Sequence, residues 1–218
     1  MDESRLLREV ETRFAVTGAS TPGWADPHAD REPLDEEYSR VTDPRKWRIE
    51  GARALAWTAA LTGSGLAERR ALAPGDARAG RDGWRLVPGA PGALPLLVLG
   101  TPVDGLLVDL ELRVGDPPVG VLDVDCRCDA CDSGSADLLE TLDSAWSNVV
   151  TGQFVHLEAP GRVLTGGAEG WSASGSAAAT RAERLAEHEA AARDLDAVRR
   201  GHAPDPRWRR VVHGAPWS

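Results

Sequence analysis

The chain has 218 residues, a formal net charge of −9 and a hydrophobic share of 42%. This length and composition are sufficient for a hydrophobic core, and they exclude a collagen-like or wholly disordered chain. The acidic balance argues against a nucleic-acid partner, because a protein this negative repels a polyanion. The basic residues are almost all arginine, with Lys46 as the single lysine. We attribute this bias to a GC-rich genome rather than to phosphate recognition.

The start of the chain is charged from the second residue onward and contains no apolar segment of signal-peptide length. The longest apolar runs, such as residues 94–99, are too short to cross a bilayer. We therefore expect a cytoplasmic protein with no membrane partner. Because thiols stay reduced in the cytoplasm, the three cysteines are not expected to form disulfides.

Four helices are predicted where apolar residues recur at helical spacing. The first covers residues 4–15, and the second begins at Pro44 behind the capping residue Asp43 and ends near Leu61. The third covers residues 135–150, and the last, with a thin apolar stripe, covers residues 180–200. The Pro-rich, acidic stretch between the first two helices is expected to be ordered but irregular.

The sequence pattern changes to that of strands over residues 84–87, 94–99, 106–114 and 119–124. In the third of these segments apolar and charged residues alternate, which favours an antiparallel sheet with one buried and one wet face. Residues 154–164 are expected to add a hairpin to the same sheet. The predicted fold class is α+β, with a mainly antiparallel sheet of about five to six strands. The helices over 44–61 and 135–150 should cover one face of this sheet.

The predicted domain organisation is a single α+β domain over residues 1–175, with a C-terminal helix and tail over residues 176–218 docked on it. The glycine-rich stretch 166–175 is interpreted as a flexible linker. The basic run 207–210 is interpreted as a solvated tail anchored by Trp208.

Cys126, Cys128 and Cys131 form a C-x-C-x-x-C motif between a predicted strand and a predicted helix. One interpretation is a structural zinc site, because zinc favours thiolate ligands and one turn can supply several of them. Three ligands are one short of the usual four. The candidates for the fourth ligand are His156 on a nearby strand and the aspartates of the turn, Asp123, Asp125, Asp129 and Asp132.

Two other interpretations of the cysteines stay open. Cys128 and Cys131 flank two residues between a strand and a helix, which is the context of thioredoxin-like dithiols. The neighbouring carboxylates of Asp129 and Asp132 would raise a thiol pKa and so oppose this use. Alternatively, the cysteines are small packing residues, and the polar residues of the turn cap the following helix.

A second polar cluster lies in the irregular segment between Trp24 and Arg40. Here His28 and Asp30 would form a base and the group that orients it, and Arg31 would hold an anion. A polar segment of this length needs a surface on which to dock. We expect it to pack beside the cysteine turn, with His28 facing a shared cleft. There His28 would complete the metal site in place of His156 or act as a base.

The run Asp125–Ser135 (DCRCDACDSGS), together with DLL at 137–139 and VVTGQF at 149–154, resembles an uncharacterised family of actinobacterial proteins. This family is domain of unknown function 6226. The run DPRKWRI at 43–49 and the tryptophan at 57 are similar to it as well. The resemblance covers residues 17–156 and implies a bacterial source, but it implies no activity.

The leading functional hypothesis is a cytoplasmic binding or interaction module whose cysteine turn holds a structural zinc ion, with Cys126, Cys128, Cys131 and His156 as the ligands. The alternative is an enzyme with a cleft between the cysteine turn and the His28 segment. The sequence leaves open whether the protein is an enzyme, and it indicates no cofactor other than zinc.

Overall fold

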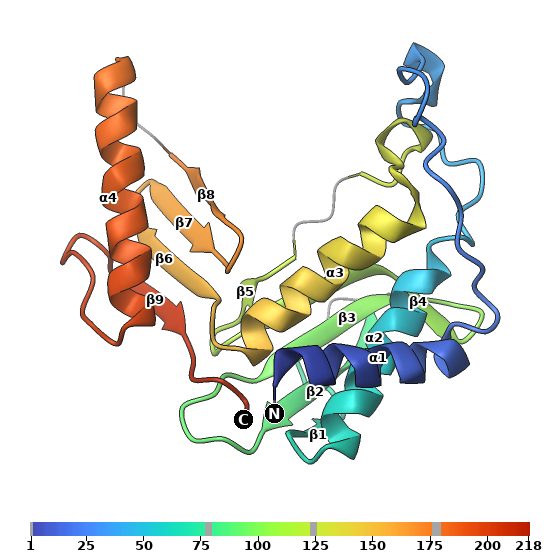
Figure 1. Cartoon of the computed structure of the whole chain (residues 1–218), viewed down its shortest axis with the longest axis horizontal. Coiled ribbons are helices and arrows are strands. Elements are labelled where there is room, and N and C mark those ends of the chain that lie inside the picture. Colours follow the sequence, from blue (N-terminus) through green and yellow to red (C-terminus); the bar gives the residue numbers. More distant parts are fainter. Residues whose placement is uncertain (1, 77–79, 123–125, 176–179) are drawn as a thin grey trace.

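The computed structural model describes residues 2–76, 80–122, 126–175 and 180–218. Within these residues the chain forms four α-helices and two antiparallel sheets (Figure 1). The predicted α+β class is therefore confirmed, as is the presence of a C-terminal helix. The arrangement differs from the prediction in one respect, because the strands divide into two sheets instead of joining in one.

The first sheet has five strands in the order β1-β2-β3-β4-β5. Their bounds are β1 Ala67–Arg70, β2 Asp82–Pro88, β3 Leu96–Val103, β4 Leu106–Val114 and β5 Val119–Gly120. Trp84 pairs with Val98, and Val98 pairs with Leu112, so these apolar residues form a row on one face of the sheet. The alternation of apolar and polar residues in the sequence therefore correctly predicts that one face of this sheet is buried.

Helices α1 (Glu3–Thr17), α2 (Arg48–Gly63) and α3 (Gly134–Val150) cover this apolar face. Together with the face they form the first core, in which Trp57 of α2 stacks on Trp146 of α3 with the ring planes 6° apart. The α2 backbone touches the sheet at Gly51, where a Cβ atom would lie 2.3 Å from the carbonyl oxygen of Leu107. A side chain at this position would push α2 off the sheet.

Helix α2 begins at Arg48, four residues later than the predicted start at Pro44. Residues 44–47 instead form turns, and the Asp43 carboxylate accepts a hydrogen bond of 3.1 Å from the Arg45 backbone N–H. Asp43 therefore caps a turn before the helix rather than the helix itself.

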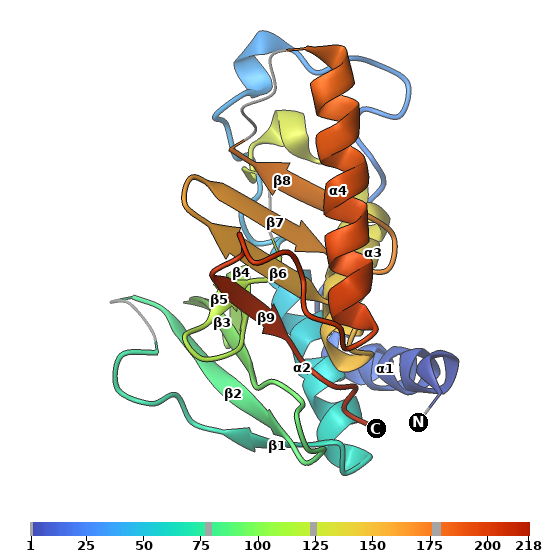
Figure 2. The same ribbon diagram turned by 90° about the vertical axis from the view of Figure 1, so that its left-hand side faces the viewer.

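The second sheet has the strand order β8-β7-β6-β9. Its strands are β6 Val155–Ala159, β7 Arg162–Gly166, β8 Trp171–Ser174 and β9 Arg210–His213. Residues 154–164 belong to this sheet, so their predicted place in the first sheet is wrong. Helix α4 (Arg181–Arg199) lies on one face of the second sheet (Figure 2), and Leu195 packs there in a separate second core with Leu157 and Leu164.

Strands β8 and β9 replace two segments that were predicted to be irregular. The stretch 166–175 is not a linker, because β8 pairs with β7 to form a hairpin. The basic run 207–210 leads directly into β9, which pairs with β6. Beyond β9, Trp217 returns to the first core and is 2% exposed. The division of the chain after residue 175 stays a prediction.

None of the helices in the described part of the chain combines the length and the apolar character needed to span a bilayer.

Candidate metal centre

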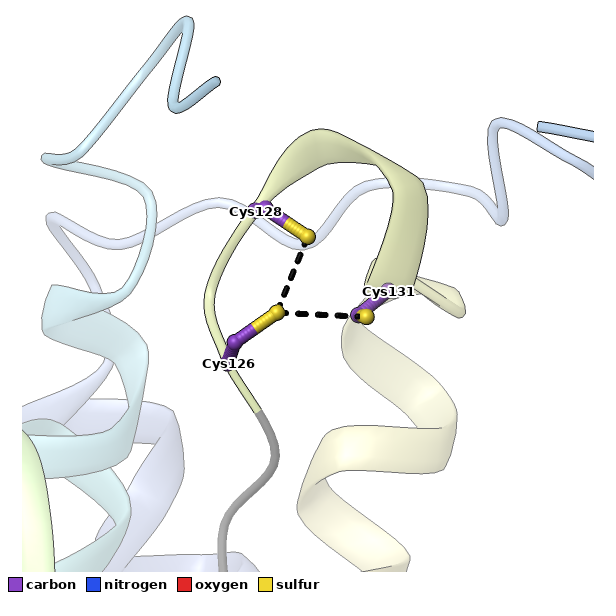
Figure 3. A group of neighbouring side chains, drawn as sticks. All are labelled: Cys126, Cys128 and Cys131. Carbon is purple, nitrogen blue, oxygen red and sulfur yellow. Dashed lines mark hydrogen bonds between the residues drawn. The ribbon is translucent and has the colours of Figure 1, made fainter. Parts of the chain in front are cut away.

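The sulfur atoms of Cys126, Cys128 and Cys131 lie together in front of the N-terminus of α3 (Figure 3). Cys126 Sγ is 2.9 Å from Cys128 Sγ and 3.3 Å from Cys131 Sγ, and all three atoms lie within 4.8 Å of one another. Four ligands arranged tetrahedrally at about 2.3 Å from a zinc ion would place sulfurs roughly 3.8 Å apart. The three cysteines are therefore close enough to bind one metal ion.

Local backbone geometry explains how two of the sulfurs meet. Cys128 precedes a short 3₁₀ turn, Asp129–Cys131, and its carbonyl accepts the Cys131 N–H at 3.0 Å. Side chains three residues apart in a 3₁₀ turn lie one above the other, so the C-x-x-C spacing places both thiols on one side. Cys126 approaches this pair from the preceding segment (Figure 3).

The contact between the thiols gives Cys128 and Cys131 different pKa values. The hydrogen bond from Cys126, helped by one from the Ser39 backbone, lowers the pKa of Cys128 to about 7, although burial opposes this. Hydrogen bonds to Cys126 and Cys128 raise the pKa of Cys131 to about 12. The Cys128 thiolate is thus accessible near neutral pH, whereas Cys131 keeps its proton. The remaining protons would leave when a cation binds, which is the usual coupling of thiolate sites to metal.

Residues 24–42, called the strap below, lie along the cysteine turn (Figure 1). Asp129 holds the end of the strap, because its carboxylate accepts bonds from the Thr42 N–H at 2.9 Å, the Thr42 hydroxyl at 2.5 Å and Arg40 Nε at 2.8 Å. The backbone N–H of Asp129 donates to the Arg40 carbonyl at 2.7 Å. These bonds hold the pKa of Asp129 well below its usual range. Asp129 thus supports the turn, and both its carboxylate oxygens are occupied.

Asp132 anchors the other end of the strap. Its side chain is buried and accepts bonds from Trp24 Nε1 at 2.8 Å, the Gly134 N–H at 3.0 Å and Lys46 Nζ at 2.5 Å. Burial alone would raise the pKa of Asp132, but the bonds from Lys46 and Trp24 outweigh it and lower the pKa. The single lysine of the chain therefore neutralises this buried carboxylate. The predicted packing of the strap beside the cysteine turn is confirmed.

His28 lies within the strap but does not join the sulfur cluster. Its Nδ1 is 3.2 Å from the Asp132 carbonyl oxygen, and its Nε2 is 3.4 Å from Glu37 Oε2. Arg31 binds the same Glu37 carboxylate with two bonds of 2.6 and 2.7 Å. Among the described residues, the group with clustered ligand atoms consists of the three cysteines alone. His28 therefore helps to hold the strap in place.

His156 lies in β6 of the second sheet and is likewise absent from the described cluster. Its Nδ1 is 2.9 Å from the Thr165 hydroxyl, and its Nε2 is 2.8 Å from Glu158 Oε1. Both ring nitrogens thus have partners within the second sheet, Thr165 on the neighbouring strand β7 and Glu158 on β6 itself. The reason for the difference from the expected ligand set is that residues 154–164 do not join the first sheet. The other two candidate ligands, Asp123 and Asp125, lie outside the described residues.

Arg127 ties the cysteine turn to the first sheet, and nothing in the sequence singled it out. Its guanidinium donates to both oxygens of Glu50 in α2, at 3.0 and 2.8 Å, and to Asp109 of β4 at 2.6 Å. Glu50 is 0% exposed and also accepts the Leu110 N–H at 3.2 Å. Burial raises the pKa of Glu50, and the bonds from Arg127 act against this rise.

A small cavity of about 100 Å³ adjoins the cysteines. The described residues that line it are Trp47, Leu122, Cys126, Arg127, Cys131, Asp132, Ser133, Gly134, Asp137, Leu138, Thr141 and Leu142. His28 is not among them, so the cavity is not the shared cleft expected from the sequence. Small-molecule sites usually measure about 300–1,000 Å³, so this one suits a very small ligand.

Acidification is expected to loosen the middle of the strap, around Glu37, before the first core unfolds. Hydrogen bonds from Arg31 and the Leu34 N–H lower the pKa of Glu37 from 4.5 to about 2. A carboxylate with a lowered folded-state pKa stabilises the fold above its unfolded pKa and loses this effect as the pH falls. The loss should begin near pH 4.5 and finish near pH 2. The amide chemical shift of Leu34, whose N–H donates to Glu37, should change in this range when followed by NMR, while those of α1 stay constant. A single transition shared by all amides would contradict this order.

Comparison with known proteins gives a family but no activity. No curated protein matches the chain, and no solved structure matches it. A family model described as a family of unknown function, DUF6226, matches residues 10–218. This match includes the cysteine turn, the strap and both sheets. The chain therefore belongs to DUF6226, a family of unknown function.

Proposed function

We propose that the protein is a cytoplasmic bacterial binding or interaction module whose fold includes a zinc ion held by Cys126, Cys128 and Cys131. The observation that carries this proposal is the meeting of three sulfur atoms from one turn within 4.8 Å. Thiolate ligands select zinc or other soft ions over magnesium and calcium. The small volume of the adjoining cavity supports a structural role over the processing of a sizeable substrate.

The contacts around the turn support a role for the metal in holding the strap. Asp129 and Asp132 attach the two ends of the strap to the turn, and Arg127 attaches the turn to α2 and β4. A metal ion that cross-links the turn would therefore order the strap as well.

The outer side of the strap supports a role in interaction. Leu34, Tyr38 and Val41 are 52%, 56% and 43% exposed, although all three are large apolar residues. Single exposed apolar residues are normal, but three within eight residues suit a surface contacted by another protein. The net charge of −9 argues against nucleic acid as this partner.

The proposal predicts about one zinc ion per chain in protein purified under reducing conditions without added metal. Elemental analysis of the desalted protein measures this ratio, and titration of free thiols before and after chelation measures how many cysteines the metal protects. All three thiols should become reactive only after chelation. Metal-free protein that does not take up zinc when it is supplied would contradict the proposal.

A second candidate function is enzymatic, and one observation favours it. Cys126 and Cys131 are exposed, and both line the cavity. A zinc ion with three protein ligands and one exchangeable ligand is typical of catalytic sites, whereas four protein ligands are typical of structural ones. The fourth position therefore decides between the two functions.

A further inference from the structure

We infer that the metal centre has an open fourth position that faces the cavity beside α3, where a water molecule is exchangeable for a small neutral nitrogen-donor ligand. This inference rests on the proposed binding of a metal by the three cysteines, and it names the ligand class of that site. The argument depends on which donors are occupied, on where the cavity lies, and on the charge of the centre.

The nearby histidines and the aspartates of the turn in the described part of the chain have other partners, and Asp137, which lines the cavity, stands outside the described sulfur cluster. Asp129 binds Thr42 and Arg40, and Asp132 binds Trp24 and Lys46. His28 and His156 have neighbours of their own and stand outside the sulfur cluster. The described residues thus supply three of the four positions that a tetrahedral ion fills.

The cavity adjoins two of the three cysteines, and the third lies against the strap. Cys128 is 4% exposed and accepts a backbone hydrogen bond from Ser39 at the strap. Cys126 and Cys131 line the cavity, whereas Cys128 is not among the described lining residues. A metal held by all three sulfurs would therefore have its free position directed toward the cavity and α3.

The size and lining of the cavity suit water or one small molecule. Water occupies about 30 Å³ in the liquid, so a cavity of this size holds roughly three molecules. The side chains of Asp137 and Thr141 line the cavity where it opens to solvent, since both residues are exposed, and they have no protein hydrogen-bond partner among the described residues. They would supply the two further partners that an ordered, metal-bound water needs.

The negative charge of the metal centre and its surroundings favours a neutral ligand over an anionic one. A divalent ion with three thiolates carries a net charge of −1, and the carboxylate of Asp137 beside the cavity adds to it. Arg127 also lines the cavity, but its guanidinium is already paired with Glu50 and Asp109, so an anionic ligand would meet an excess of negative charge at short range. Imidazole satisfies the requirements, because it is neutral at pH 8, has one nitrogen donor and contains five heavy atoms.

Cobalt(II) replaces zinc as the probe, because the full-length protein loaded with cobalt reports two properties separately. Absorption from sulfur-to-cobalt charge transfer shows that the thiolates bind the metal, which tests the proposed function. The visible d–d bands respond to the fourth ligand, which tests the open position. Imidazole should change the d–d bands in a saturable way and leave the charge-transfer bands in place. The larger 4-phenylimidazole has the same donor atom and should have no effect.

The variant Thr141→Val tests where the position points. Valine keeps the shape of threonine but removes one partner of the bound water, so imidazole should bind about two- to tenfold more tightly. Unchanged charge-transfer bands in this variant show that the fold and the thiolate site are intact.

Four results would overturn parts of this scheme in distinguishable ways. Absence of charge-transfer bands would refute the proposed metal site itself. Charge-transfer bands with d–d bands that ignore imidazole would leave the metal site standing and refute the open position, as if Asp123 or Asp125 completed the site. An equal response to both ligands would place the open position in bulk solvent instead of the cavity. Unchanged imidazole affinity in Thr141→Val would refute its orientation toward α3.

Discussion

Replacing Cys128 with serine is expected to abolish tight zinc binding and the zinc-dependent part of the protein's stability. Cys128 is the buried member of the triad and the one whose sulfur contacts the strap backbone. A ligand that binds only the folded protein stabilises it by about 4 kcal/mol when present at 1,000 times its Kd. Thermal unfolding with and without added zinc should show this difference for the natural protein and none for Cys128→Ser.

Ser133→Ala is the matched control, because Ser133 lines the same cavity but supplies no sulfur. This variant should keep the response to zinc. The chelated natural protein should resemble Cys128→Ser in stability, since both lack the metal. If Cys128→Ser still gained as much stability from zinc as the natural protein does, the three sulfurs would not be the ligands.

Replacing Arg127 with methionine is expected to destabilise the protein by about 3–5 kcal/mol at neutral pH, the usual cost of removing one partner from a buried ion pair. Methionine keeps much of the side-chain length and leaves the carboxylate of Glu50, which is 0% exposed, without its cation. Urea unfolding monitored by circular dichroism measures the change in the free energy of unfolding.

The pH dependence of this variant has a definite sign. Burial raises the pKa of Glu50 in the folded protein, and without Arg127 only the weaker effect of the Leu110 N–H opposes the rise. A group with a raised folded-state pKa favours folding below its unfolded pKa, and this contribution is lost as the pH rises through the folded value. The cost of Arg127→Met should therefore be largest at pH 7–8 and should shrink toward pH 4.

Arg113→Met is the control for the loss of an arginine, because Arg113 lies in β4, one of the elements that Arg127 contacts. Arg113 is 30% exposed and pairs with Glu111, which is 43% exposed. Pairs of this kind contribute about 0–1 kcal/mol, so this variant should be almost as stable as the natural protein at every pH. A cost of similar size and pH dependence in both variants would show that burial of Glu50 is not the cause.

The elements that the sequence predicts well are those whose buried face can be recognised from the spacing of apolar residues within one segment. The alternation over residues 106–114 predicts β4, and the apolar stripe over residues 135–150 predicts α3, because each buries one face against the first core. The start of α2 is less predictable, since Asp43 caps equally well the turn that precedes the helix.

The short strands could not be predicted, because their partners lie elsewhere in the chain. β1, β8 and β9 have four residues each, and their backbone hydrogen bonds form only when a neighbouring strand is in place. β9 pairs with β6, which lies about fifty residues earlier. The division of the strands into two sheets follows from this pairing, and no local sequence pattern predicts it.

Some features of the candidate site can likewise be predicted from the sequence, and others cannot. The spacing of the cysteines indicated that their sulfurs would meet, because the 3₁₀ turn is a local structure. The pairing of Arg127 with Glu50 spans 77 positions, and neither residue differs from the many other charged residues around it. His156 stands outside the described sulfur cluster because its strand, β6, belongs to the second sheet. The bond between Asp132 and Lys46 could be anticipated only from the rarity of lysine in the chain.

The return of Trp217 to the first core constrains how the protein is made. Leu6 and Trp217 belong to the same buried cluster, although they come from opposite ends of the sequence. A ribosome delivers residue 217 only after α4 and β9, so α1–α3 and the first sheet wait for these elements with part of their apolar surface uncovered. The first core therefore closes only after the second sheet has been made, and until then the nascent chain presents that surface to chaperones.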